Sequence, residues 1–460
     1  MTTGHNNVAI GLGAMGSSEN IGYAVAVGSE ALNNANAVDD SDSSVAIGNK
    51  ALYALVSGIG NVAVGGEALS SEDDGDHNTA IGHNALKDQA GTTGTVANTA
   101  LGYKAGEHVT TGVYNTYLGN QSGMNASGSA ADANAGVGYR ALEALTSGSE
   151  NTALGAYAAL QIVNASDIVA LGHYTLANAN VSTDIDGCVA IGSFSQAENK
   201  TGQGNVTIGR SALQQDVNSD FNTAVGHYAL YNQNGINGEA ANTVMGYNAG
   251  FSITTGKKNV FIGRSAGAST TDVDNAIGIG WAALNGALTS AADGIVCIGN
   301  SSGNNITTAA RITGVGDGTF QRAGTGQSDS VAIGYQALNG TVAGTCEKNI
   351  AIGVYSMNVN QTHVQQNTAV GYQSLRYLAG SGANYNSAFG SDAGVRITAG
   401  SYNTAIGSGV LGEASGNAIT GDYNTGVGAL ALYNLEGAAT ENTAIGYNSL
   451  FALTTGQQNT

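Results

Sequence analysis

Hydrophobic and polar positions follow one short word that recurs along the chain. The word reads Asn, Val or Thr, Ala, Ile, Gly, and 25 copies end on a glycine at intervals of 17 to 21 residues. The residue before this glycine is apolar in all 25 copies, and the residue three before it is Val, Ile or Thr in 23. β-Branched residues at alternating positions predict a short strand with one face buried. The clearest structural repeat glycines are Gly11, Gly48, Gly82, Gly155, Gly226, Gly334 and Gly446.

The residues after each glycine complete the unit. Three residues later every copy has a small side chain, and the next residue is Leu in 14 copies and Gly in six. Such a short strand has too few large side chains to build a core alone, so we expect identical coils to stack. The sequence predicts an all-β fold, a parallel β-solenoid of about 25 coils that fills residues 1–460 as one continuous array. The absence of proline agrees, because proline removes a ladder hydrogen bond.

The two faces of the predicted strand differ in side-chain size. We expect the large apolar residues, such as Ile333, to form a buried ladder. The position between them is Ala or Gly in 20 copies, and this small-residue stripe lies on the other face. It would let another chain approach closely, or it would pack against the return segment of its own coil.

Asparagine precedes the glycine by four residues in 17 copies, for example at Asn61, Asn78 and Asn151. Stacked amides can bond along the solenoid and cap the turn into the strand. We therefore expect a structural ladder in preference to a contact with glycans.

Composition excludes several classes of protein. The 460 residues include 70 glycines, no proline and a net charge of −19. Collagen needs a strict triplet with proline, and the acidic balance argues against nucleic-acid binding. We find no apolar run for membrane insertion and no signal peptide. Cys188, Cys297 and Cys346 lie far apart and are read as small buried or loop residues. No catalytic, cofactor-binding or metal-binding motif stands out, so we expect no enzyme and no cofactor.

The repeated word resembles the head repeats of trimeric autotransporter adhesins, the YadA-like family, and the NTAxG arrays of phage tail fibres. The resemblance covers essentially residues 7–460 and implies a left-handed parallel β-roll, three chains side by side, on the surface of a virion or cell. The matching residues are structural, so no binding residue comes with them. The expected function is a fibre or adhesin-like shaft, extracellular, with itself as partner in a homotrimer and a host glycan or receptor as a further partner.

Aromatic residues directly after the glycine are the candidate contacts with a surface glycan. They are Tyr103, Tyr139, Tyr247, Trp281, Tyr335, Tyr372 and Tyr447. The alternative is that they shield the bend. Two acidic loops, Asp39–Asp42 and Glu72–Asp76, are candidate calcium sites, with a solvated loop as the alternative.

A second function remains open. Neither end of the chain shows a capping unit, so the sequence is a piece of a longer fibre or a subunit that stacks head to tail into a filament. An acyltransferase solenoid would show a hexapeptide rhythm, which is missing. An ice-binding face would need an uninterrupted threonine column, but Val replaces Thr in other copies.

Overall fold

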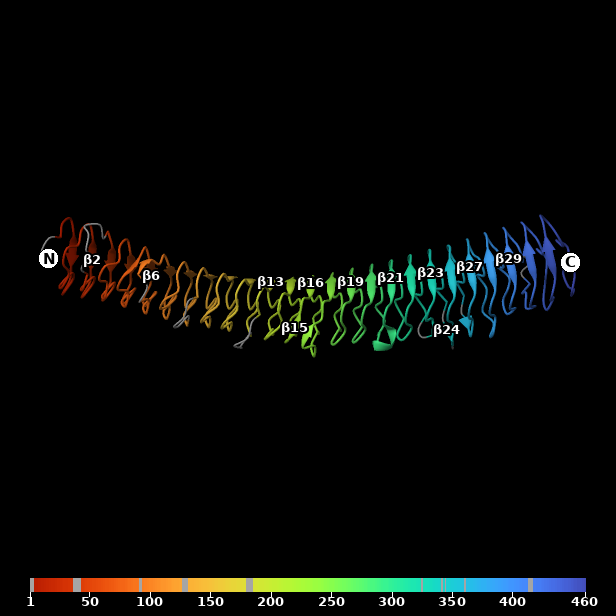
Figure 1. Ribbon diagram of the computed structural model, residues 1–460, viewed down its shortest axis with the longest axis horizontal. Helices are drawn as coiled ribbons and strands as arrows, with labels where there is room; N and C mark the ends of the chain where they lie inside the picture. Colours follow the sequence, from red (N-terminus) through yellow and green to blue (C-terminus); the bar gives the residue numbers. More distant parts are fainter. Residues whose placement is uncertain are drawn as a thin grey trace. The chain divides into compact units, whose positions relative to one another are not determined.

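The fold is all-β, a parallel solenoid of short strands joined by turns and loops, as the sequence predicts (Figure 1). The computed structural model describes residues 4–35, 43–90, 93–125, 131–178, 185–323, 326–340, 342–343, 345–359, 361–412 and 417–460. They form two compact units, Met1–His227 with Asn234–Glu239, and Tyr228–Gln233 with Ala240–Thr460. Each unit is a stack of coils with one principal strand per coil.

The first unit contains thirteen principal strands, each of three residues, and four strands of two residues. The principal strands are β1 (Val8–Ile10), β2 (Val25–Val27), β3 (Val45–Ile47), β4 (Val62–Val64), β6 (Thr79–Ile81), β8 (Thr99–Leu101), β9 (Thr116–Leu118), β10 (Ala135–Val137), β11 (Thr152–Leu154), β12 (Val169–Leu171), β13 (Val189–Ile191), β14 (Val206–Ile208) and β16 (Thr223–Val225). The short strands pair as β5 (Gly75–Asp76) with β7 (Gly94–Thr95), and β15 (Ser219–Asp220) with β17 (Gly238–Glu239).

The second unit has twelve principal strands, two short strands and one 3-10 turn. The principal strands are β18 (Thr243–Met245), β19 (Val260–Ile262), β20 (Ile277–Ile279), β21 (Val296–Ile298), β22 (Thr313–Val315), β23 (Val331–Ile333), β25 (Ile350–Ile352), β27 (Thr368–Val370), β28 (Ser387–Phe389), β29 (Thr404–Ile406), β30 (Thr425–Val427) and β31 (Thr443–Ile445). The short strands β24 (Val342–Ala343) and β26 (Gln361–Thr362) pair, and η1 covers Ser290–Ala292.

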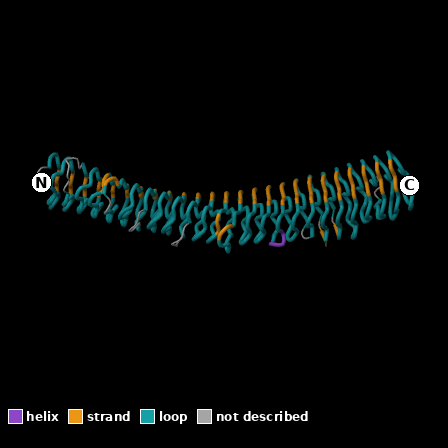
Figure 2. The backbone as a smooth tube through the Cα atoms, in the orientation of Figure 1, coloured by secondary structure: helices purple, strands orange, loops and turns teal. Residues whose placement is uncertain are grey.

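Neighbouring coils pair at equivalent positions. In the second unit β23 pairs with β25 in parallel, with Val331 beside Ile350 and Ile333 beside Ile352. Figure 2 shows these strands side by side, with loops and turns making up the rest of each coil. Equivalent side chains therefore form columns, and each position of the repeat can be described by its column.

The repeat glycine needs both its backbone freedom and its lack of a side chain. Gly155 has φ +140°, and a Cβ atom placed on it would lie 2.5 Å from the Gly172 carbonyl oxygen of the next coil. Gly226 shares the positive φ, at +137°. A larger residue would meet strained backbone and a neighbouring main chain at once, which explains why the glycine recurs.

The prediction of which strand face lies inside the coil was wrong. Ala332 in the middle of β23 is fully buried, whereas the Ile333 side chain is 38% exposed. The small-residue stripe faces the interior, where it packs with the small residue and the leucine that follow the glycine, such as Ala337 and Leu338. The coil is too narrow for two rows of large residues, so the large β-branched side chains point outward. The small-residue stripe thus offers no surface to another chain.

Exceptions to the repeat compensate each other in size. Tyr117 is fully buried at the middle strand position, and its coil has Gly123 where most coils have leucine. A Cβ on Gly267 would lie 2.7 Å from the Phe261 ring in the same way. The opposite arrangement occurs in the coil of β22, where the large residue, Phe320, is at the leucine position and the glycine, Gly314, is in the middle of the strand. In these three coils a large side chain at one position is matched by glycine at the other, because buried voids and overlaps both destabilise a core.

The predicted asparagine ladder is confirmed. The Asn61 side-chain oxygen accepts the backbone N–H of Asn78 at 2.8 Å, and its amide donates to the Gly75 carbonyl at 2.8 Å. Asn78 repeats the first contact with Asn98. These amides are fully buried, so they connect coils and satisfy loop carbonyls.

Candidate interaction surfaces

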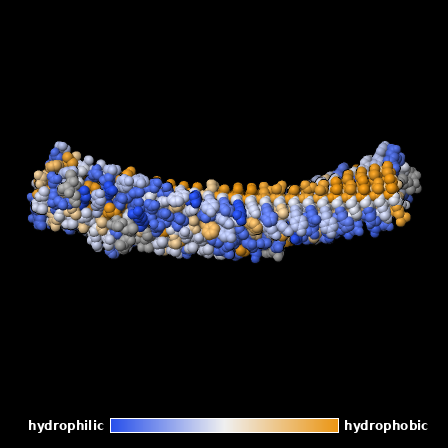
Figure 3. All heavy atoms as spheres, turned by 180° about the vertical axis from the view of Figure 1, so that it is seen from behind, coloured by the Kyte–Doolittle hydropathy of each residue, from blue (hydrophilic) through white to orange (hydrophobic). Residues whose placement is uncertain are grey.

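In each unit, the outward face of the strands carries an apolar stripe. In every principal strand the first and third residues are partly or fully exposed, and the third residue is always apolar. In register, Leu101 lies beside Leu118 in the first unit and Phe389 beside Ile406 in the second. Figure 3 shows such residues as a row of hydrophobic side chains along one face. A row of Val, Ile and Leu side chains that stays in contact with water marks an interaction surface in soluble proteins.

The predicted glycan contacts are on the surface but do not form one ladder. Their exposed fractions range from 42% for Tyr139 and Tyr335 to 73% for Tyr447. No two of the seven lie in neighbouring coils: Asn120 separates Tyr103 from Tyr139 in the column. Several of these rings contact other residues instead, as when Tyr139 packs edge-on against Tyr157 at 5.1 Å. The glycan contact stays a prediction for these residues.

Among the predicted glycan contacts, Tyr247 lines a hollow in the surface of the second unit. The hollow has a volume of about 310 Å³ and is lined by Tyr228, Tyr231, Phe251 and Asn248 besides Tyr247. Tyr231 and Phe251 stack at 5.3 Å with nearly parallel rings, and Tyr228 stands perpendicular to both. Repeated aromatic residues at the second and fifth positions after the glycine produce this cluster, which the sequence analysis missed because it considered only the first.

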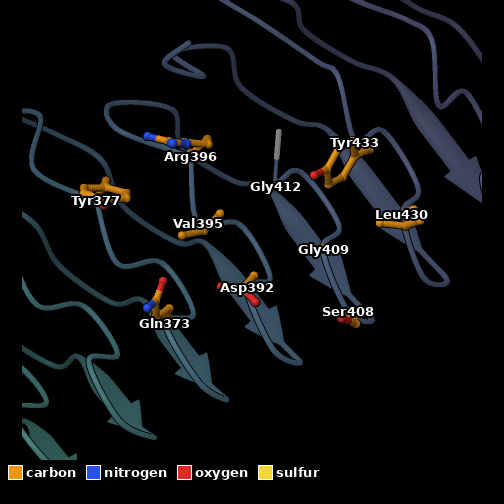
Figure 4. Close-up of a pocket in the computed structure, with 10 residues that line it drawn as sticks. All are labelled: Gln373, Tyr377, Asp392, Val395, Arg396, Ser408, Gly409, Gly412, Leu430 and Tyr433. Atoms are coloured by element: carbon orange, nitrogen blue, oxygen red, sulfur yellow. The ribbon is translucent and has the colours of Figure 1, made fainter. Parts of the chain in front are cut away.

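A second hollow, of about 350 Å³, lies in the second unit between Asp392 and Tyr433 (Figure 4). It is lined mainly by polar side chains, with two tyrosines and two glycines. None of the residues that line it was among the predicted sites. The signal is the pair Gly409 and Gly412, two and five residues after a repeat glycine, where most other coils have side chains.

The acidic loops were candidate calcium sites. In Glu72–Asp76 the carboxylates accept hydrogen bonds from the protein: Glu72 from the Gly75 N–H at 2.7 Å, and Asp76 from the Ile59 N–H at 2.9 Å. Asp74 accepts the Ser57 hydroxyl at 2.7 Å. Residues 39–42 lie outside the described residues. Among the residues that the structure describes, no three His, Cys, Asp or Glu side chains are placed to hold a metal ion.

The burial of two carboxyl groups was not predicted from the sequence. Glu72 and Asp216 both lie seven residues after a repeat glycine, at a position that other coils fill with Leu55, Leu145 or Ile162. Both side chains are fully buried, and burial raises the pKa of each to about 7. The Ser219 N–H donates to the Asp216 carboxyl at 3.2 Å. From the sequence, Glu72 is expected either in a calcium site or in a solvated acidic loop, and Asp216 is not singled out.

The three cysteines are buried and free, which confirms their reading as small buried residues. Cys188 replaces the ladder asparagine, and its sulfur lies 3.3 Å from the Gly202 carbonyl oxygen. Burial raises the pKa of the Cys188 thiol to about 11 and that of Cys297 to about 12. Thiols with such high pKa values are poor nucleophiles at neutral pH.

Comparison with protein-family models gives no match to this chain, and comparison with curated proteins gives none either. In the described part of the chain, no helix has the length and apolar character to cross a membrane. The proposals below therefore depend on the surfaces of the solenoid itself.

Proposed function

We propose that the chain is a structural shaft: a solenoid that associates with two further copies of itself into a fibre on the outside of a virion or cell. The observation that carries this proposal is the exposed apolar stripe. Its side chains are half exposed in the single chain, as for Ile208 at 39% and Ile333 at 38%. Self-association along the stripe would remove them from water in coil after coil.

The energetics favour such a contact. A half-exposed isoleucine that becomes buried gains about 1 kcal/mol, and the gain recurs with each coil. The number of chains, three, comes from the resemblance to adhesin head repeats. The net charge of −19 per chain keeps assembled shafts apart in solution.

The regular structure also supports a mechanical role. Each coil forms hydrogen bonds and ladder contacts with the coils beside it, and the residues that recur in the repeat make these contacts. Exposed aromatic residues such as Tyr372 and Tyr447 then supply surface contacts, with a glycan as the proposed ligand.

Light scattering on the purified chain tests the proposal. We expect a mass three times the 45.7 kDa of the chain, independent of concentration. The triple variant Leu154→Lys, Ile208→Lys, Ile333→Lys places charges in the stripe and should give monomers that keep the circular dichroism spectrum. The control Ser147→Lys, Gln203→Lys, Thr308→Lys alters exposed residues of the return segments and should stay trimeric.

Other outcomes decide against the proposal. A monomer at every concentration contradicts self-association, and a mass that is equal for both triple variants contradicts the role of the stripe. A mass that grows with concentration without limit supports head-to-tail filaments.

A further inference from the structure

The hollow beside Tyr433 arises from two missing side chains in one coil. The coil that follows Gly407 has Gly409 two residues and Gly412 five residues after the repeat glycine. The coil before it has Asp392 and Val395 at these positions, and the coil after it has Leu430 and Tyr433. Figure 4 shows the two glycines between these pairs of side chains. The hollow is therefore a notch one coil wide, with a volume of about 350 Å³.

One face of the notch is an aromatic ring with a fixed orientation. Tyr433 stacks on Phe451 of the next coil at 5.3 Å, with an angle of 3° between the rings. Gly412 occupies the same column in the preceding coil, so this column presents no side chain to the opposite face of Tyr433. A Cβ placed on Gly409 would lie 3.5 Å from the Tyr433 ring, which places this ring directly above the floor of the notch.

The opposite side and the rim carry hydrogen-bonding groups. Asp392 and Gln373 lie in the column of Gly409, and Ser408 lies at the exposed rim. The Arg396 guanidinium lies 5.0 Å from the centre of the Tyr377 ring, which restrains its orientation beside the notch. A carboxylate accepts hydrogen bonds, whereas a guanidinium donates several in a fixed plane.

We propose that this notch is a binding site for one pyranose unit of a saccharide. The ring centres of Tyr433 and Phe451, in neighbouring coils, are 5.3 Å apart, so one absent side chain leaves a gap of about that width. A six-membered sugar ring is thin enough to fill this gap. Its C–H bonds pack against the negative face of the Tyr433 ring, as the positive edge of another ring would. Its hydroxyls donate to Asp392 and accept from Arg396 and Gln373. The volume lies within the range of small-molecule sites.

The two glycines set the size of the site. Gly409 has φ +65°, and its Cβ would approach Leu430 Cδ2 at 3.0 Å, the end of a side chain that can move. Other residues adopt positive φ at the same repeat position, for example Gln373 and Asp392. A side chain at Gly409 can therefore be accommodated by the backbone, and it would fill the notch.

Saturation-transfer NMR tests the site on the full chain, with methyl α-glycosides of glucose, galactose, mannose and N-acetylglucosamine as probes at millimolar concentration. We expect transfer to at least one glycoside. Gly409→Asn and Tyr433→Ala should each weaken binding about tenfold, through occlusion and through loss of the aromatic face. The matched control is Gly318→Asn, which changes a glycine of the same column with φ +66° in a coil that lies outside the notch.

The outcomes separate this site from the proposed fibre. Absence of transfer to all four probes, or equal transfer for Gly409→Asn and the native chain, overturns the saccharide site. The melting temperatures of both asparagine variants show whether a loss reflects unfolding. A monomeric chain that binds a probe would support the saccharide site and contradict the fibre. A trimer that binds none of the probes would support the fibre and contradict the saccharide site.

Discussion

Ala332 and Ile333 are consecutive residues of β23, yet Ala332 is fully buried and Ile333 is 38% exposed on the opposite face. The pair defines the inside and the outside of the coil. Strand geometry accounts for the difference, because successive side chains point to opposite faces.

The two positions should respond differently to a charge. Ala332→Asp places an unpaired carboxylate in the interior and should destabilise the chain by several kcal/mol, about 3 or more. Ile333→Asp leaves the charge at the surface, so the free energy of unfolding of an isolated chain should change by less than about 1 kcal/mol. Denaturant unfolding at low protein concentration measures both. Equal losses would contradict the assignment of the faces.

The repeat glycine should tolerate no side chain. Gly155→Ala combines positive φ with a Cβ 2.5 Å from the Gly172 carbonyl oxygen, so we expect a loss of about 3 kcal/mol. Gly437→Ala is the control, because this glycine has φ +55° and no atom within 4 Å of a Cβ. It should cost about 1 kcal/mol. Thermal melting compares the two, and a similar shift for both would show that close approach of the coils adds nothing.

The asparagine ladder should contribute through buried hydrogen bonds. Asn151 donates to the Ala165 carbonyl at 2.7 Å and accepts from the Ile168 N–H at 3.2 Å. Asn151→Ala leaves both groups unpaired in the interior and should cost about 2 to 4 kcal/mol. The exposed Asn120→Ala should be close to neutral. Hydrogen exchange at the amide of residue 168 should accelerate in Asn151→Ala alone. Unchanged protection there would argue against the ladder as a stabilising element.

Stability should depend on pH through Asp216. Burial raises its pKa to about 7 in the folded chain from 3.8, so folding favours the protonated form. Its favourable contribution is complete below pH 3.8 and is lost as the pH rises through about 7. Asp216→Asn should therefore raise the melting temperature at pH 8, with a gain that disappears near pH 4. Each pKa unit is equivalent to about 1.4 kcal/mol.

A second buried carboxyl, that of Glu72, should show the same dependence of stability on pH. Glu72→Gln should act in the same direction, since burial raises the pKa of Glu72 to about 7. The exposed Glu239→Gln should show no such difference between pH 4 and pH 8. A loss of stability in Asp216→Asn at pH 8 would mean that this carboxyl is ionised and well solvated in the folded chain.

Much of the fold could be predicted because the repeat constrains it many times. The close approach of coils at Gly155 requires glycine, and the hydrogen-bonded ladder at Asn151 favours asparagine. Because the same residue recurs in many coils, both roles can be recognised from the sequence. The inside of the coil was harder to predict, since both strand faces are apolar and alternation alone does not tell them apart. Burial is decided by volume: Ala332 and Leu338 together fill a coil that a row of isoleucines would overfill.

The sites were less accessible to sequence reasoning. Asp216 is unusual only when compared with Leu145 and Ile162 in the same column. The notch at Gly409 requires knowledge of which columns point outward. In both cases the signal is a departure from the repeat, whereas the predictions rest on the residues that recur.

Gly155 and Gly172 occupy equivalent positions in the glycine column, so the gene can lose the segment between them without disrupting the repeat. Loss of residues 156–172 would join Gly155 to His173 and leave each remaining position with an equivalent neighbour. Unequal recombination between repeats can thus add or remove one coil at a time, and every product of such a step can still fold as a solenoid. Related genes are expected to encode solenoids that differ in length by whole numbers of coils. Selection can then act on the length of the solenoid in small, discrete steps.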